Sequence, residues 1–353
     1  MFFAPQVGYD LTTTRSRLKG STMQLLTDQD ITAISPAKTV GWIREAVKLH
    51  GSGALESPAR VSAKLAQGKL TFTAGADPRL FGFRSYDTLP TTAGEQVTVV
   101  HERDTGRVAA IHIGNDLGAM RTGALGGVAA SLIGPVGPCE LAMIGTGEQA
   151  WRQLWALSAT LNITVARVFS RNPDARRVFC ERARTELGIN AAPAESAKDA
   201  VTGADAVVLA TNSATAVIDS AWLKGDVMVT TMGPKQVGRA EFKLDLVTGA
   251  DLVVTDSLAQ LRAYDPPSLV ADAGLADHVK QLSDLLAVQS PAAAQTAADR
   301  NSNTGPVSIA GNAAAPTVAT PRNPRQGRRV YLSVGLAGTE VHLLGRIAEH
   351  LRP

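Results

Sequence analysis

Residues 140–150, ELAMIGTGEQA, decide the fold. The apolar run at 140–144 predicts a buried strand, and the residues after it predict a helix over about 148–161, because Ala150, Leu154 and Leu157 recur at helical spacing. A strand, a glycine-containing turn and a helix in this order are typical of the first unit of a nucleotide-binding α/β sheet.

The turn has the pattern G-x-G-x-x-A, and each small residue has a physical reason. Gly145 permits the tight turn, Gly147 lets the backbone approach a pyrophosphate, and Ala150 lets the helix pack close to the sheet. The N–H groups at the helix start then point at the phosphates. We predict dinucleotide contacts from five residues of this turn: Gly145, Thr146, Gly147, Glu148 and Gln149.

The segments after this turn alternate between strand and helix. A second helix is predicted over 173–187, and further strands at 164–169, 206–210, 227–232 and 252–255. This alternation predicts an α/β fold with a Rossmann-type parallel sheet over residues 136–286.

The segments before it predict a different, sheet-rich α+β region. A helix is expected from Thr27 to His50, followed by strands at 70–74, 80–86, 97–101 and 107–113. A helix rich in Gly and Ala at 119–134 indicates close backbone packing. Residues 1–20 show no periodicity, and 287–327 is a low-complexity stretch that we interpret as a mobile insertion. A strand at 330–336 and a helix ending at Leu351 are expected after it.

The end of the second strand predicts which cofactor is used. An NAD enzyme normally carries Asp or Glu there, whereas this strand ends Ser170-Arg171-Asn172, which suits a 2′-phosphate. We therefore predict NADP(H) in preference to NAD(H). The alternative is that Arg171 is only a solvated loop residue while Asn172 caps the next helix. Further cofactor contacts are predicted after the strands at 206–210 and 227–232, from Thr211, Asn212, Ser213, Met232 and Gly233.

Composition excludes several other classes of protein. The net charge of +3 is spread along the chain, which argues against a nucleic-acid partner. Two cysteines, Cys139 and Cys180, give neither a disulfide framework nor a zinc site, and the six histidines show no metal-ligand spacing, so no metal is predicted. No signal peptide and no membrane-spanning run is expected, and the predicted location is the cytoplasm.

Four segments together resemble the ornithine cyclodeaminase/mu-crystallin family: Met120–Ala124, the GTGEQA turn, Gly233–Glu241 and Ser333–Ala337. The resemblance covers roughly residues 25–285 and 328–350. It implies a homodimer in which residues 1–135, completed by 328–353, form the domain that dimerises and holds a small amino or imino acid against the nicotinamide. Residues 136–286 would be the dinucleotide-binding domain.

The resemblance also implies a basic cluster that binds the substrate carboxylate. By motif position its members are Arg60, Arg84 and Arg121, although the family usually has Lys where Arg84 stands. Guanidinium groups bind carboxylates bidentately, and the start of a helix at Arg121 adds a favourable dipole. Arg121 is therefore predicted both to bind substrate and to take part in catalysis.

The chain departs from the family's cyclodeaminases at Lys235, where those enzymes carry an aspartate that contacts the amino groups of ornithine. A cation there repels the ammonium group of a diamino acid. The predicted function is therefore an NADPH-dependent reductase of a small imino or ketimine acid, with Lys235 as a catalytic residue. Lys235 has three open roles: a proton donor, a ligand for a second carboxylate, or a solvated side chain. The alternative functions are a cyclodeaminase that recycles NAD(P)+ and a non-catalytic protein that binds NADPH or a small ligand.

Overall fold

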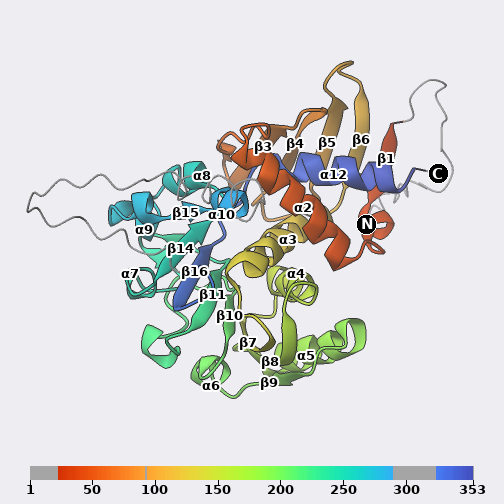
Figure 1. Ribbon diagram of the computed structural model, residues 1–353. Helices are drawn as coiled ribbons and strands as arrows, with labels where there is room; N and C mark the ends of the chain where they lie inside the picture. Colours follow the sequence, from red (N-terminus) through yellow and green to blue (C-terminus); the bar gives the residue numbers. More distant parts are fainter. Residues whose placement is uncertain (1–22, 92–93, 289–322, 353) are drawn as a thin grey trace, which may run out of the picture.

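The computed structural model describes residues 23–91, 94–288 and 323–352, which form two sheets with helices packed against them (Figure 1). The predicted tail at 1–20 and nearly all of the predicted insertion at 287–327 lie outside the described residues. The element that links the two sheets in the chain is the helix α3, Asp116–Ile133, which follows one sheet and precedes the other.

The larger sheet has eight strands, all parallel, in the order β15-β14-β16-β11-β10-β7-β8-β9. This confirms the predicted α/β fold and each of the five predicted strands. The strands are β7 Pro138–Ile144, β8 Asn162–Phe169, β9 Ala191–Pro193, β10 Ala206–Leu209, β11 Val227–Thr231, β14 Leu252–Thr255, β15 Lys280–Gln281 and β16 Arg328–Leu332.

The strand order reverses between β7 and β10. From β7 the chain moves outward through β8 and β9, then returns to β10 and continues through β11 in the other direction. Ligands of open parallel sheets bind at the carboxyl ends of the strands beside such a reversal. That position lies where Gly145 follows β7 and Thr211 follows β10.

Helices cover both faces of this sheet, and their ends follow simple capping chemistry. The helix α5 runs over the predicted residues, Pro173–Leu187, because Asn172 caps its start, Pro173 suits its first position, and Gly188 ends it in the left-handed conformation. The other helices of this half are α4 Glu148–Leu157, α6 Ala197–Val201, α7 Asp245–Thr248, α8 Leu258–Arg262, α9 Leu269–Asp272 and α10 Leu282–Val288. A small hairpin, β12 Lys235–Gln236 and β13 Arg239–Ala240, follows β11.

The smaller sheet has six strands in the order β1-β6-β5-β4-β3-β2. The four predicted strands are present, and two that were not predicted flank them. The strands are β1 Gln24–Thr27, β2 Val61–Leu65, β3 Gly68–Ala76, β4 Leu80–Asp87, β5 Val97–Glu102 and β6 Val108–Ile113. The single helix predicted over 27–50 is wrong in its first part: α1 covers only Asp28–Ile31, and α2, Pro36–Gly51, starts anew because Ser35 caps it and Pro36 suits its first turn.

The glycines of α3 allow the two halves of the molecule to pack closely. A Cβ at Gly123 would lie 2.2 Å from the carbonyl oxygen of Arg152 on α4, and one at Gly127 would lie 2.8 Å from Val40 on α2. Almost every residue of α3 is buried. The close backbone packing predicted from this composition is therefore confirmed.

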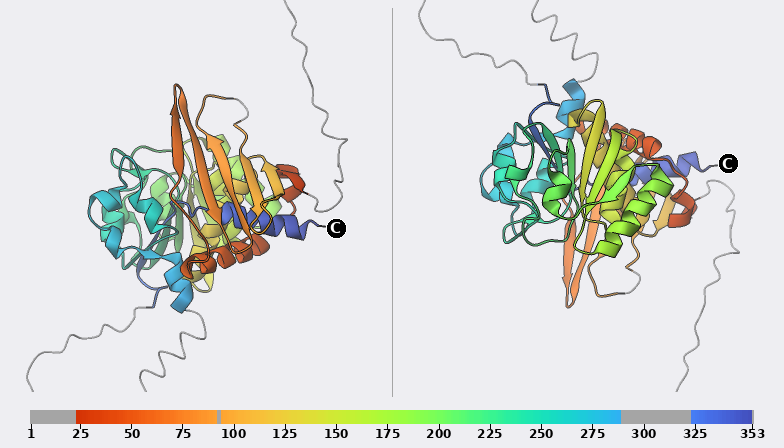
Figure 2. Two further views of the ribbon diagram at one scale, coloured as in Figure 1. Left: turned by 90° about the horizontal axis from the view of Figure 1, so that it is seen from above. Right: turned by 90° about the horizontal axis from the view of Figure 1, so that it is seen from below.

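The C-terminal segment divides between the two sheets. The strand β16 pairs with β11 and β14 in the larger sheet, whereas α12, Thr339–His350, packs across strands β3–β6 of the smaller one (Figure 2). Our grouping of residues 328–332 with the first domain is therefore wrong for the strand: Val330, Tyr331 and Leu332 are fully buried, as a central parallel strand requires. The loop from Ser333 to Gly338 connects the two halves.

Candidate functional site

The turn after β7 has the geometry that its glycines predict. Gly145 has a φ of +115°, and a Cβ there would lie 2.2 Å from the carbonyl oxygen of Ala210, so this position excludes every side chain. No atom lies within 4 Å of a Cβ built at Gly147. Ala150 is fully buried, and no side chain caps the start of α4. An open glycine beside uncapped helix N–H groups is a suitable place for a phosphate.

A hollow of about 190 Å³ adjoins this turn between α4 and α5. Thr146, Gly147 and Glu148 form one side of it, and Trp151 and Arg182 form another. The Arg182 guanidinium lies 3.8 Å from the centre of the Trp151 ring. Glu148 and Gln149 are exposed, and Glu148 pairs with Arg152 one turn later on α4.

The three residues at the end of β8 differ in how they are held. Asn172 accepts a hydrogen bond from the Ala175 N–H at 3.1 Å, which is the expected helix cap, and the Ser170 hydroxyl donates to the Asn172 carbonyl at 3.2 Å. Arg171 is exposed and has no hydrogen bond or ion pair to any residue that the structure describes. Arg171 is therefore the free cation at this end of β8.

A buried glutamate that the sequence analysis did not assign a role holds the loops after β10 and β11 together. Glu241 has no exposed surface, and its carboxylate accepts hydrogen bonds from the Thr211 N–H (3.0 Å), the Thr211 hydroxyl (2.8 Å) and the Gly233 N–H (2.5 Å). Burial raises the pKa of Glu241, although Lys235 and these hydrogen bonds oppose the shift. The only sequence signal was that Glu241 lies in a motif of the resembled family.

The remaining predicted cofactor residues surround this carboxylate. The Met232 N–H donates to the Leu209 carbonyl at 2.8 Å, which continues the ladder between β10 and β11. Asn212 is exposed, and the Ser213 hydroxyl donates to the Thr215 carbonyl at 2.7 Å. A Cβ at Gly233 would lie 2.2 Å from the Thr211 carbonyl, so the two loops are in backbone contact at this point.

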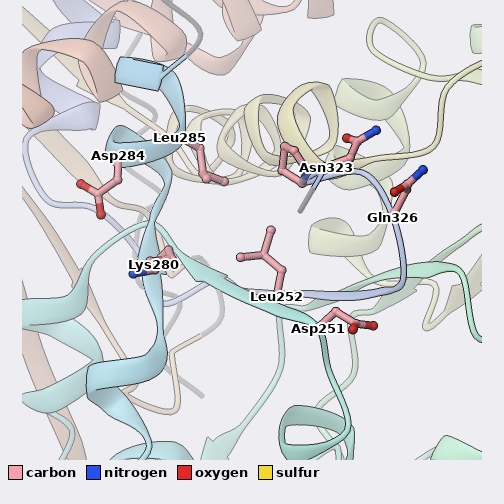
Figure 3. A pocket seen from close by; sticks show the side chains of 8 residues that line it. Asp251, Leu252, Lys280, Asp284, Leu285, Asn323 and Gln326 are labelled. Carbon is pink, nitrogen blue, oxygen red and sulfur yellow. The ribbon is translucent and has the colours of Figure 1, made fainter. Parts of the chain in front are cut away.

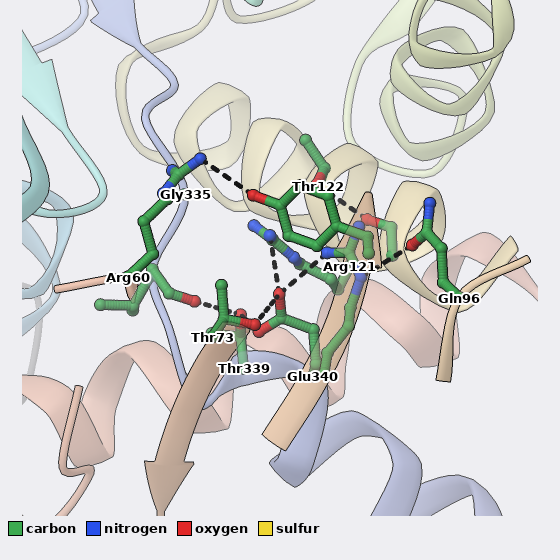
Figure 4. A network of polar contacts seen from close by, with 12 residues as sticks. Arg60, Thr73, Gln96, Arg121, Thr122, Gly335, Thr339 and Glu340 are labelled. Carbon is green, nitrogen blue, oxygen red and sulfur yellow. Dashed lines mark hydrogen bonds and ion pairs between the residues drawn. The ribbon is translucent and has the colours of Figure 1, made fainter. Parts of the chain in front are cut away.

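The structure brings Arg84 and Arg121 together around a second buried glutamate, Glu340 at the start of α12 (Figure 4). One oxygen of Glu340 lies 2.7 Å from Nη2 of Arg121 and 3.1 Å from Nη1 of Arg84. Burial alone would raise the pKa of Glu340, but the two guanidinium groups lower it below its ordinary value. The sequence analysis did not identify Glu340, because a lone glutamate near a helix start is usually only a favourable charge at the helix dipole.

The hydrogen bonds of the two arginines differ. Arg84 also donates from Nε to Gln96 at 2.8 Å and stacks on the Tyr86 ring at 4.6 Å, and its guanidinium fits only because Gly118 has no side chain: a Cβ there would lie 2.5 Å from Cζ. By contrast, Nε and Nη1 of Arg121 are buried and have no hydrogen-bond partner among the described residues. A buried charged donor without a partner is costly unless a ligand completes it.

Arg60 lies next to Arg121, across Gly335. A Cβ at Gly335 would lie 3.2 Å from Nη2 of Arg60 and 3.3 Å from Nη1 of Arg121, so both guanidinium groups lie close to this glycine and a side chain here would crowd them. Arg60 also donates to Gln260 at 3.0 Å, to Tyr86 at 3.3 Å and to the Val334 carbonyl. The three arginines predicted as one cluster therefore do lie together.

The loop that carries Gly335 is held by Asp256. This buried carboxylate accepts hydrogen bonds from the Val334 N–H (3.0 Å), the Gly335 N–H (2.9 Å) and the Tyr331 hydroxyl (3.2 Å). The loop follows β16, which is parallel to β7 and β10 in one sheet, so it lies at the same edge as the dinucleotide turn. The arginine cluster and the candidate cofactor site therefore both adjoin the edge formed by the carboxyl ends of the strands.

Lys235 is buried rather than solvated, which removes one of its three predicted roles. Its Nζ donates to the Gly233 carbonyl at 2.7 Å, and it acts electrostatically on Glu241. Among the described residues no hydrogen bond or ion pair joins Lys235 to an arginine of the cluster.

A further cavity in the described part of the chain lies elsewhere. It has a volume of about 360 Å³ and is lined by residues that include Leu252, Lys280 and Leu285, near the amino ends of β14 and β15 (Figure 3). That is the edge opposite to the dinucleotide turn, so this cavity takes no part in the candidate site. Within the described ranges no three His, Cys, Asp or Glu side chains are grouped to hold a metal ion, and no helix there has the length and apolar character to cross a membrane.

The sequence profile of the ornithine cyclodeaminase/mu-crystallin family matches residues 23–295. The chain belongs to this family. A curated relative, Δ1-pyrroline-2-carboxylate reductase from Bacillus thuringiensis, is 30% identical over 161 residues, which cover 46% of this chain and 49% of that protein. This chain spans about half the length of several curated relatives that it matches, between 49% and 56%.

Two solved structures share the fold over nearly the whole chain. Δ1-pyrroline-2-carboxylate reductase from Thermococcus litoralis, in complex with NADH and L-proline, has a TM-score of 0.74 at 21% identity, covering 93% of this chain and 97% of that one. Iminosuccinate reductase from Paracoccus denitrificans, in complex with NAD+, has the same TM-score at 20% identity, with 93% and 97% covered. At this level of identity the likeness establishes the fold.

Proposed function

We propose that this family member is an NADPH-dependent reductase that transfers hydride to the C=N carbon of a small imino or ketimine acid. The observation that carries the proposal is the buried Arg121 guanidinium, whose Nε and Nη1 have no hydrogen-bond partner in the described part of the chain. A substrate carboxylate is the ligand that completes such a site. Relatives named as reductases of Δ1-pyrroline-2-carboxylate and of a ketimine support this substrate class.

The residues of the chain then divide the work of the reaction. Arg121, assisted by Arg60, binds the carboxylate and so orients the C=N bond at the strand edge, while Arg84 and Glu340 hold Arg121 in place. The bound dinucleotide supplies the hydride. The imine nitrogen needs a proton, and Lys235 is our candidate donor because it is a buried ammonium group on the hairpin that follows β11.

The dinucleotide is expected at the turn after β7, with its pyrophosphate against Gly147 and the uncapped start of α4. Arg171 is the candidate ligand for a 2′-phosphate, because it is exposed at the end of β8 and has no described partner. The two related structures contain NADH and NAD+, so the preference for NADP(H) rests on Arg171.

The direct test is NADPH oxidation followed by absorbance, with NADH in parallel. The substrates are preformed cyclic ketimine acids and α-keto acids mixed with ammonia or amines, and an ammonia-release assay with L-ornithine runs alongside. Net NADPH oxidation with an imino acid supports the reductase. Ammonia from ornithine without net change in the cofactor supports the cyclodeaminase instead. Binding of NADPH without either reaction supports the non-catalytic alternative.

We also propose that the chain forms a homodimer through the smaller sheet. Thr73 and Arg84 point toward α12, so their neighbours along β3 and β4 point away from it. Paired residues on that outer face form an apolar row across five strands: Ala74, Phe83, Val99, Ile111 and Leu25. Leu25 is 52% exposed, and Phe72, Phe81 and Ile113 on the same sheet are each more than a third exposed. An apolar face of this kind marks a protein interface.

Sedimentation analysis tests this interface. Val99→Lys places a charge in the middle of the row and is expected to convert a dimer into a monomer. Val136→Lys is the matched control, because Val136 is 79% exposed between α3 and β7, away from the row. A dimer that survives Val99→Lys would contradict the proposed interface.

A further inference from the structure

The carboxylate of Glu340 lies inside the arginine cluster, where a carboxylate ligand would otherwise bind. Its side chain is 1% exposed, and one of its oxygens contacts both Arg84 and Arg121. The hydroxyls of Thr73 (3.5 Å) and Thr339 (3.4 Å) complete its surroundings. A glutamate held in this way has the same acceptors and the same charge as a bound carboxylate ligand.

The remaining hydrogen-bonding capacity of the cluster is limited. Glu340 uses Nη1 of Arg84 and Nη2 of Arg121, and Gln96 uses Nε of Arg84. Arg60 donates to Gln260, Tyr86 and the Val334 carbonyl, none of which is a carboxylate. Only Nε and Nη1 of Arg121 are buried donors of the cluster without a partner in the described part of the chain. These two donors of Arg121 suffice for one carboxylate.

We infer that Glu340 determines substrate specificity by acting as a built-in second carboxylate, so that the cluster accepts imino acids with one carboxylate and rejects dicarboxylic ones. The inference rests on the proposed function, because it concerns the same arginines. A second substrate carboxylate that reached Arg84 or Arg121 would share them with Glu340, and two like charges on one pair of guanidinium groups repel each other. Without Glu340, the same donors would be free to bind that second group.

Calorimetric titration of the whole chain with pyruvate and with oxaloacetate tests the inference, since these keto acids differ by one carboxylate. The wild-type chain should bind pyruvate more tightly. Glu340→Ala should shift the ratio of the two dissociation constants toward oxaloacetate at least ten-fold. Formate, which is the removed carboxylate as a free ion, should then restore the preference for pyruvate in Glu340→Ala and leave the wild-type chain unchanged.

Glu340→Gln is the matched variant, because its amide fills the space without the charge. It should lose the discrimination, and formate should have no effect on it. If Glu340→Ala does not fold, as a thermal melt would reveal, Glu340→Gln still supplies the test. Wild-type preference for oxaloacetate, or an unchanged ratio in a folded variant, would overturn the inference.

The proposed function fails separately from this inference. The wild-type chain could discriminate between the keto acids as expected and yet fail to oxidise NADPH with every imino acid tested. The reductase proposal would then be wrong, while the role of Glu340 would stand. If neither keto acid binds at all, the carboxylate site itself is wrong, and the inference is overturned with it.

Discussion

Two buried glutamates organise the two halves of the candidate site, and they do so by different physics. Glu340 lies between two guanidinium groups, which lower its pKa. Glu241 has backbone N–H groups and a hydroxyl as its hydrogen-bond partners, and burial raises its pKa. We call the residues around Glu340 the proposed substrate half of the site and those around Glu241 the proposed cofactor half. Charged side chains organise the first, whereas hydrogen bonds to backbone N–H groups fix the loops of the second.

The surrounding residues follow the same division. Next to Glu340, Nε and Nη1 of Arg121 have no partner among the described residues, and the Arg60 guanidinium lies close by across Gly335. In the cofactor half, Gly147 is open and the start of α4 has no side-chain cap, so helix N–H groups are the expected donors there. We therefore expect charge-removing substitutions to act mainly on substrate turnover in the first half, and on cofactor affinity in the second.

Arg121→Ala should give the largest effect. It removes a guanidinium with two buried donors that have no partner in the described part of the chain, and we expect kcat/KM for an imino acid to fall on the order of 10³-fold, since a lost charged contact in a desolvated site is worth several kcal/mol. The dissociation constant of NADPH should stay within about two-fold, as the contact is not to the cofactor. Steady-state kinetics and fluorescence titration with NADPH measure the two quantities.

Arg79→Ala is the matched control for Arg121→Ala, because Arg79 forms a surface ion pair with Glu349 and its side chain is 54% exposed. Its kinetics should be those of the wild type. Equal losses in both variants would mean that Arg121 acts through stability rather than through the substrate.

Arg171→Ala should give the next effect, and only on one cofactor. If Arg171 binds the 2′-phosphate, the dissociation constant of NADPH should rise about 10- to 100-fold, in line with a lost hydrogen bond between charged groups, while that of NADH stays constant. Arg177→Ala serves as the control, because Arg177 is an exposed arginine on the neighbouring helix α5. A parallel loss for both cofactors would contradict the assigned role.

Glu241→Gln should give a smaller effect on the cofactor half. The amide still accepts from Thr211 but places an NH2 group against the Gly233 N–H, so one loop is released. We expect the dissociation constant of NADPH to rise roughly ten-fold, with the free energy of unfolding lower by about 1–3 kcal/mol. Urea unfolding and cofactor titration compare this variant with the control Glu181→Gln, because Glu181 is an exposed glutamate on α5. An unchanged dissociation constant of NADPH in Glu241→Gln would show that Glu241 does not contribute to cofactor binding.

Much of the fold could be predicted from local signals. The strand at 140–144, the turn at Gly145 and the helix over 173–187 follow from apolar runs, glycines and caps, which act over a few residues. The edge strands β1 and β2 were missed, because every residue of β2 is exposed, and β1 has only four residues, QLLT, in which apolar and polar residues do not alternate. The position of β16 depends on pairing with β11 and β14, which no local pattern encodes.

Residues of the candidate site could be predicted only where they lie in a motif of the resembled family. Arg60, Arg84 and Arg121 were grouped by family resemblance, and the structure brings them together. Glu340 has no such signal, because it is a single acidic residue whose arginine partners come from distant segments of the chain. Glu241 lies in a family motif, but the motif alone does not reveal its contact with Thr211. The roles of the site residues, the dimer and the cytoplasmic location remain predictions.

The smallest expected effect is on how the free energy of unfolding changes with pH, and it has opposite signs for the two glutamates. Glu340 has a lowered pKa in the folded state, so its contribution to stability is present above the ordinary carboxyl pKa and is lost as the pH falls through the folded value. The difference in unfolding free energy between the wild type and Glu340→Gln should therefore shrink as the pH is lowered below about 4.5. Glu241 has a raised pKa, so ionising it costs stability as the pH rises from the ordinary value through the folded value, and Glu241→Gln removes that loss. The wild type should thus lose stability relative to Glu241→Gln as the pH rises, opposite in sign to the Glu340 variant. Urea unfolding of the three proteins across the acidic range measures both slopes, and slopes of the same sign would contradict the contrast between the two halves of the site.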